Sequence, residues 1–139
     1  MKINLKSLFI SGFITGLIII IIGGCLVPLI GNQMEEVLKN RLLPPLSIGA
    51  MIFFAFNSIF MGLGVVGLYA LLKLIVKTKI IAIITTTIIF WFFTYFLSSA
   101  ALIAYGFMPI RLTAIGTLWG LLEVFLSLLV GSKLYREIK

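Results

Sequence analysis

Histidine and aspartate are absent from the sequence, and cysteine occurs once, at Cys25. Because zinc and haem sites rely on histidine nitrogens or cysteine thiolates, we expect no metal ion and no cofactor. A serine–histidine–aspartate triad is impossible, and a single cysteine excludes an internal disulfide. Since no motif of catalytic specificity is left, we expect that the chain is not an enzyme.

Charge is also scarce. Only 11% of the 139 residues are charged and 62% are hydrophobic, whereas ordinary soluble domains carry roughly 25% charged residues. A chain of this composition has too few polar side chains to cover a folded domain. We therefore expect one transmembrane domain over residues 1–139.

The apolar residues are gathered into four long runs. A helix needs about 20 such residues to cross a hydrocarbon core, and every run reaches that length. The runs predict transmembrane helices over residues 8–30, 46–72, 80–105 and 110–134. Lipid offers no partner to exposed backbone groups, so helices are favoured over open strands. Because short connections place successive helices antiparallel and adjacent, the predicted fold class is all-α, an integral membrane four-helix antiparallel bundle.

Basic residues are unevenly distributed between the two sides of this predicted bundle. The side with both termini carries Lys2, Lys6, Lys73, Lys77, Lys79, Lys133, Arg136 and Lys139. The other side carries only Lys39, Arg41 and Arg111. By the positive-inside rule, we expect cytoplasmic N- and C-termini in a multi-pass protein of the cell inner (plasma) membrane. The basic residues then attract membrane lipids, and we expect no nucleic-acid partner.

The segment between the first two runs, residues 33–43, has the pattern of a short amphipathic helix. Asn32 and Glu35 have the spacing of an N-terminal capping box, and Glu35 and Lys39 are one turn apart. Its apolar residues share one face: Met34, Val37, Leu38 and Leu42. We predict that this helix lies on the outer membrane surface. A solvated loop is the alternative, because the segment is only roughly three turns long.

The first 25 residues also resemble a bacterial lipoprotein signal, in which an apolar stretch ends at a cysteine that is lipidated after cleavage. Lys2 and Lys6 precede the stretch, and Gly23 and Gly24 precede Cys25. However, the apolar region is longer than the roughly 7 to 15 residues of a signal peptide and continues beyond the cysteine. We therefore interpret Cys25 as a small packed residue.

Small and polar residues recur every three or four positions along the fourth run and so share one helical face. They are Thr113, Gly116, Gly120, Glu123, Ser127 and Gly131. Gly116 and Gly120 form a G-x-x-x-G pair, and Gly12 and Gly16 form another in the first run. Such pairs let helix backbones approach closely in membranes, so we expect all four glycines to serve helix packing.

Glu123 lies twelve residues from Arg111 and ten from Lys133, near the middle of its run. An acidic side chain at the centre of a membrane helix costs roughly 2.5 to 3.5 kcal/mol by insertion scales. We therefore expect polar neighbours at the same depth. These are Asn57, Thr94, Trp91 and Thr15, of which Asn57 is the preferred contact. The predicted polar site comprises Glu123, Asn57, Thr94 and Ser127.

The last run also resembles part of a known group of proteins. Residues 118–123 (LWGLLE), followed by Gly131 and then by residues 134–137 (LYRE), are similar to the end of a group of small bacterial four-helix inner-membrane proteins. The resemblance covers the last span only. It implies the four-helix topology, and no activity is attached to that group.

Two interpretations of Glu123 lead to two functions. As a neutral hydrogen-bond clamp it fixes the register of the helices, and the chain is then a non-enzymatic, self-associating bundle or an accessory subunit of a membrane complex. As a proton or cation carrier it makes the chain a small proton-coupled transporter or channel. The first is favoured, because a lone carboxyl without an Arg, Lys, His or second acid inside the membrane gives a proton nowhere obvious to go. A membrane enzyme acting on lipid has support only from Glu35, Glu36 and Arg41.

Overall fold

The computed structural model of the protein describes residues 3–42, 47–76 and 78–138. In order, its elements are α1 (Leu5–Gly24), α2 (Val27–Asn40), α3 (Ile48–Ile75), α4 (Lys79–Trp91), the π-helical segment η1 (Phe92–Phe96), α5 (Leu97–Ala104) and α6 (Ile110–Leu134). Four helical segments are long and apolar enough to cross a membrane: α1, α3, the continuous stretch Lys79–Ala104, and α6. This confirms the all-helical class and the four long apolar helices. Lys2, Lys77 and Lys139, and residues 43 and 46 at the ends of two expected helices, lie outside the described residues.

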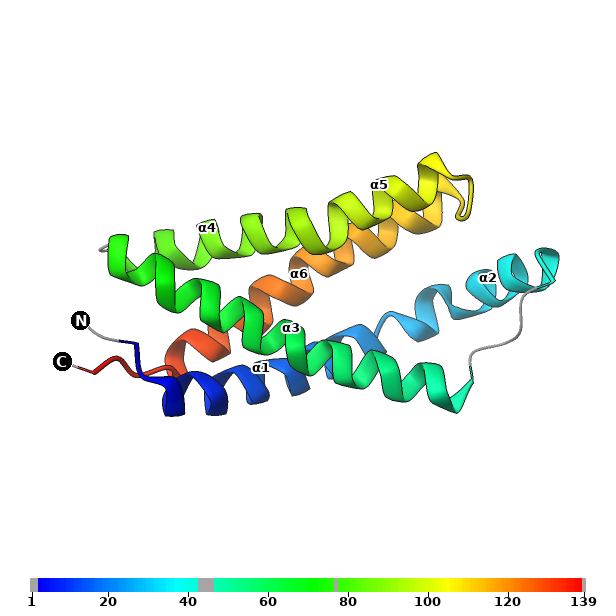
Figure 1. Ribbon diagram of the computed structural model, residues 1–139. Coiled ribbons are helices and arrows are strands. Elements are labelled where there is room, and N and C mark those ends of the chain that lie inside the picture. The colour runs from blue at the N-terminus through cyan, green and yellow to red at the C-terminus, as the bar shows by residue number, and fades with distance from the viewer. Residues whose placement is uncertain (1–2, 43–46, 77, 139) are drawn as a thin grey trace.

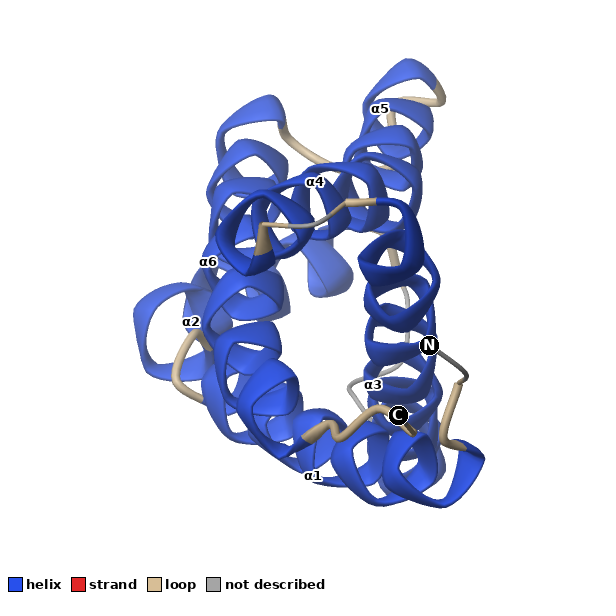
Figure 2. Ribbon diagram, turned by 90° about the vertical axis from the view of Figure 1, so that its left-hand side faces the viewer, coloured by secondary structure: helices blue, strands red, loops and turns tan. Residues whose placement is uncertain are grey.

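The four long segments run back and forth along the length of the molecule, which lies from left to right in Figure 1. The start of α1, the end of α6 and the connection between α3 and α4 lie at one end, which we call the terminal end. The turn between α5 and α6 lies at the opposite end, the turn end. Viewed from the terminal end, the helices form a ring in the order α1, α3, α4 and α6 (Figure 2). Neighbours in this ring are in contact, and α3 also contacts α6 across it.

Local signals explain where these helices begin. The side chain of Asn4 accepts a hydrogen bond from the Ser7 amide at 3.1 Å, and Ser47 caps α3 in the same way through the Ala50 amide at 3.2 Å. These caps satisfy amide groups that have no partner within the helix. Gly106 has a φ of +67° in the turn before α6, a conformation that favours glycine.

Glycine residues bring α1 and α3 into the most extensive helix contact of the fold. A Cβ atom added at Gly62 would lie 2.2 Å from the Gly16 amide nitrogen and 2.4 Å from the Gly12 carbonyl oxygen. Both contacts are with backbone. Gly12 and Gly16 therefore lie at a crossing where three glycines leave no room for side chains, as expected for close helix packing.

The buried core lies near the terminal end. Val65 and Val66 of α3 and Val124 and Leu128 of α6 are fully buried, and Tyr69 packs edge to face on Tyr135 with ring centroids 6.3 Å apart. Toward the turn end, the pair formed by α1 and α3 diverges from the pair formed by the third long segment and α6 (Figure 1). The first half of α3 is consequently exposed, including a row of large apolar side chains: Ile48, Met51, Ile52, Phe53, Phe54, Phe56 and Phe60.

The segment after the first span differs from the expectation. α1 ends at Gly24, and α2 begins at Val27, with Pro28 in its first turn. A proline suits that position because an amide hydrogen is not needed there. Asn32 therefore lies inside α2, so the expected capping box is wrong. Three of the four expected face residues, Met34, Val37 and Leu38, are partly buried on α2, whereas Leu42 lies beyond the end of the helix and is 95% exposed. The Glu35 and Lys39 side chains are 3.7 Å apart.

Candidate functional site around Glu123

Glu123 lies in the interior, on the face of α6 that packs against the other helices. It is 7% exposed, and its carboxyl accepts a hydrogen bond from the Tyr95 hydroxyl. Tyr95 belongs to η1, so this hydrogen bond joins the third long segment to the fourth. A carboxyl buried among apolar side chains requires such a partner, since burying a polar group without a hydrogen bond costs roughly 2 to 7 kcal/mol.

Gly120 and η1 position Tyr95. A Cβ atom added at Gly120 would lie 2.2 Å from Cδ1 of the Tyr95 ring, so the ring occupies the space that a larger residue would fill. The π-helical turn Phe92–Phe96 inserts an extra residue into the helix at this point. Such π-helical turns occur frequently at functional sites, because they redirect a side chain without breaking the helix.

The end of α1 covers the other side of the carboxyl. A Cβ atom at Gly23 would lie 3.6 Å from Oε1 of Glu123, so a methyl group at this position would make ordinary contact with the carboxyl. Beside it, the Trp119 ring nitrogen donates a hydrogen bond to the Ile22 carbonyl at 3.0 Å. Three segments, α1, η1 and α6, therefore meet at Glu123.

The residues that surround Glu123 in the structure differ from those expected. Asn57 is exposed on α3, and its amide donates to the sulfur of Met61 on the same helix at 3.6 Å. The expected contact between Asn57 and Glu123 is therefore replaced by Tyr95. The physical reason is the divergence of the helices, which carries the first half of α3 away from α6 at this level.

Thr94 and Ser127 donate to carbonyl groups of their own helices. The acceptors are Phe90, at 2.7 Å from Thr94, and Val124, at 3.1 Å from Ser127. Thr15 does the same with Ser11 at 2.7 Å, and it packs on Gly131 rather than beside Glu123. Hydroxyl groups that are satisfied within one helix do not form a relay between helices, so these residues do not extend the site.

Two further hydrogen bonds continue the polar links toward the turn end. The Trp91 ring nitrogen donates to the Thr117 carbonyl at 2.7 Å, and the Thr117 hydroxyl lies 2.7 Å from the Ser99 hydroxyl. Both tie the third segment to α6. A Cβ atom added at Gly116 would have no neighbour within 4 Å, so this glycine does not share the packing role of Gly120.

A groove of about 720 Å³ lies on the α2 side of the site, formed by α2 and the end of α1. Its lining is largely apolar but includes Asn32 and Glu35. Gly23 belongs both to this groove and to the surroundings of Glu123. The carboxyl is therefore separated from a partly polar groove by the backbone at a single glycine.

Sequence reasoning identified Glu123 and Gly120 but missed the roles of Tyr95 and Trp119. A signal for Tyr95 was present, since it lies four residues after Trp91 and so near the same helical face. Comparisons of the chain with protein-family models, with curated proteins and with solved structures gave no match. The site must therefore be interpreted from its own chemistry. That chemistry is a buried carboxyl with one phenolic donor, whose ring packs on Gly120.

Proposed function

We propose that the chain is an integral protein of the cell inner (plasma) membrane, in which four helices cross the bilayer and both termini lie in the cytoplasm. Large apolar side chains are exposed along every long helix, among them Phe9, Phe60, Phe93 and Leu118, each more than half exposed. In water this surface would drive aggregation, whereas lipid covers it without cost. The excess of basic residues at the terminal end supports a cytoplasmic location for that end. α2 then leaves the bundle at the outer surface.

Within the membrane, we propose a non-enzymatic role as a self-associating bundle. If the partner is another protein, the chain is instead an accessory subunit of a larger membrane complex. The observation that carries this proposal is the exposure of Asn57 between Phe53 and Phe60 on α3. In lipid, an exposed amide needs a hydrogen-bond partner, and the Met61 sulfur is only a weak acceptor. Asparagine side chains on membrane helices find such partners across helix–helix interfaces.

Glu123 has a structural role in this proposal. Its hydrogen bond with Tyr95 fixes α6 against the third long segment, and Gly23 at the end of α1 lies beside the same carboxyl.

Self-association is tested with two differently tagged copies expressed together and purified in mild detergent. We expect one tag to recover the other, and we expect Asn57→Leu to reduce this recovery by roughly five-fold to thirty-fold, the equivalent of the about 1 to 2 kcal/mol of an interhelical amide bond. Ser98→Leu is the matched control, because Ser98 is a polar residue exposed on α5 and the same side chain is introduced. Equal recovery from the Asn57→Leu and control proteins would disprove the role of Asn57. A wild-type monomer from which crosslinking recovers no partner would disprove association altogether.

The second candidate is a small proton-coupled transporter or channel that uses Glu123. The groove of about 720 Å³ favours it, because Gly23 lines this groove and also lies beside the carboxyl. The test is Glu123→Gln in sealed vesicles with an imposed pH gradient. A proton flux that is present in the wild type and lost in a folded Glu123→Gln protein supports transport. Equal flux in both proteins, or none in either, excludes it.

A further inference from the structure

The two ends of the chain are bound to each other at the terminal end (Figure 1). The backbone amide of Arg136 donates a hydrogen bond to the Ser7 hydroxyl at 2.7 Å, and the backbone amide of Asn4 donates to the Tyr135 hydroxyl at 3.4 Å. These contacts join residues that are 129 and 131 positions apart. The segment after α6 is thereby held against the first turn of α1.

This arrangement forms an open surface cavity of about 250 Å³. Its lining is Asn4, Lys6, Ser7, Ile10, Leu134 and Arg136. Lys6 and Arg136, two cationic residues from opposite ends of the sequence, thus line the same cavity. Ser7 and Asn4 add a hydroxyl and an amide group to its lining. Ile10 and Leu134 provide its apolar wall. Among the described residues that line the cavity, none is acidic.

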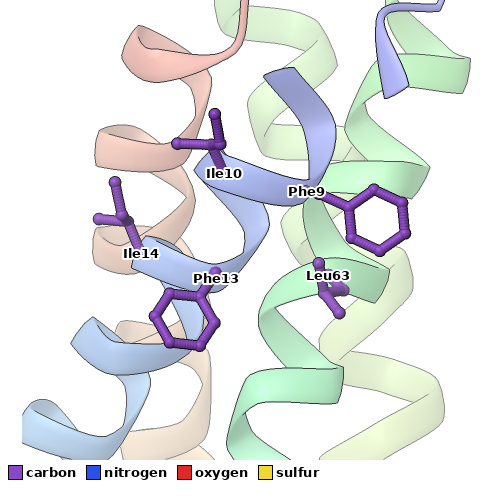
Figure 3. A pocket seen from close by; sticks show the side chains of 5 residues that line it. All are labelled: Phe9, Ile10, Phe13, Ile14 and Leu63. Atoms are coloured by element: carbon purple, nitrogen blue, oxygen red, sulfur yellow. The ribbon is translucent and has the colours of Figure 1, made fainter. Parts of the chain in front are cut away.

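A second, apolar groove adjoins the cavity. It has a volume of about 370 Å³, and its lining is Phe9, Ile10, Phe13, Ile14 and Leu63 (Figure 3). Ile10 lines both spaces, and in Figure 3 it lies on α1 directly above Ile14, toward the start of the helix. A cationic cavity at the end of the bundle therefore leads into a groove that runs along the apolar surface of α1 and α3.

We propose that these two spaces form one binding site for an anionic phospholipid, with the phosphate group between Lys6 and Arg136 and an acyl chain in the groove of Figure 3. The proposal rests on the membrane location proposed above. Arginine binds phosphate oxygens through two parallel hydrogen bonds, and lysine adds a point charge. Basic pockets between membrane helices on the cytoplasmic side are suited to lipid headgroups of this charge. The cavity is smaller than the about 300 to 1,000 Å³ of pockets that enclose whole ligands, which fits a headgroup whose chains lie outside it.

Lipid binding is tested by native mass spectrometry of the purified protein titrated with phosphatidylglycerol, with phosphatidylcholine as the uncharged reference. We expect Lys6→Gln and Arg136→Gln to weaken phosphatidylglycerol binding about five-fold each and about 30-fold together, which corresponds to about 1 kcal/mol per charge. The matched control is the pair Lys79→Gln and Lys133→Gln. It removes the same charge from exposed lysines at the same end, outside the cavity, and we expect binding within about two-fold of wild type.

Several results would overturn the proposal. Equal losses in the two double variants would show a general charge effect and no site. Competition by millimolar inorganic phosphate as effective as by the lipid would identify free phosphate as the ligand. If the protein remains in carbonate-washed membranes but Lys6→Gln and Arg136→Gln leave phosphatidylglycerol binding unchanged, the lipid site is disproved and the membrane location stands. Release of the protein by carbonate would instead remove the membrane location on which the site depends.

Discussion

The sharpest structural prediction concerns Gly62, where α1 and α3 cross. In Gly62→Ala, the new Cβ atom would lie 2.2 Å from the Gly16 amide nitrogen and 2.5 Å from the Gly16 Cα atom. Ordinary contact begins at about 3.5 Å, so the two backbones must separate by roughly 1 Å. Neither atom belongs to a side chain that can rotate away. A gap of that size forfeits about a quarter to a half of each dispersion contact across the crossing. We therefore expect a loss of about 3 kcal/mol or more in the free energy of unfolding, at the upper end of overpacking effects.

Gly67→Ala provides the matched control on the same helix. A Cβ atom at Gly67 has nothing within 4 Å, so the same chemical change meets open space there. Both variants are measured by denaturant titration of the protein in one detergent, followed by circular dichroism. We expect Gly67→Ala to stay within about 0.5 kcal/mol of wild type, as for substitutions away from packed positions. If Gly62→Ala is as stable as Gly67→Ala, the close approach of α1 and α3 is refuted.

Three further predictions concern the surroundings of Glu123. Tyr95→Phe keeps the ring on Gly120 but removes the hydroxyl, and it should cost about 1 to 3 kcal/mol in the same titration, because a buried carboxyl loses its donor; a change below about 0.5 kcal/mol would contradict the hydrogen bond. Gly120→Ala should cost about 1 to 3 kcal/mol by displacing the Tyr95 ring, and this cost should largely disappear when residue 95 is alanine, whereas additive effects would show that the two positions do not touch. Trp119→Phe should cost about 1 kcal/mol through the lost bond to Ile22, and an unchanged midpoint would argue against contact between α6 and the end of α1.

Much of the architecture followed from composition and hydropathy. The last helix, Ile110–Leu134, has the expected bounds, and the third segment differs from its expected range by one residue at each end. Such agreement arises because the length and the apolar character of a run are local properties of the sequence. The break at Cys25 and Leu26 was not foreseen, since the apolar run continues through it and only Pro28 indicates a new helix start.

The candidate site was only half predictable. Periodicity identified Glu123 and the small residues of its helical face, because these properties belong to one helix. The choice of partner depends on how far the helices diverge and on the extra residue in η1, and neither leaves a periodic pattern. Asn57 is exposed on the surface of α3, and its amide donates to Met61 of the same helix instead of reaching Glu123. Tyr95 reaches the carboxyl because Gly120 leaves space for its ring.

The membrane location is tested most directly by cysteine accessibility in intact cells stripped of any outer barrier. In a Cys25→Ser background, one cysteine is introduced at Phe107, exposed in the turn before α6, or at Ile138, exposed beyond its end. We predict that a membrane-impermeant maleimide labels the variant at position 107 from outside and the variant at position 138 only after the cells are opened, with both proteins retained in carbonate-washed membranes. Labelling of both positions from the same side, or release of the protein by carbonate, would contradict a four-helix bundle that crosses the bilayer with cytoplasmic termini.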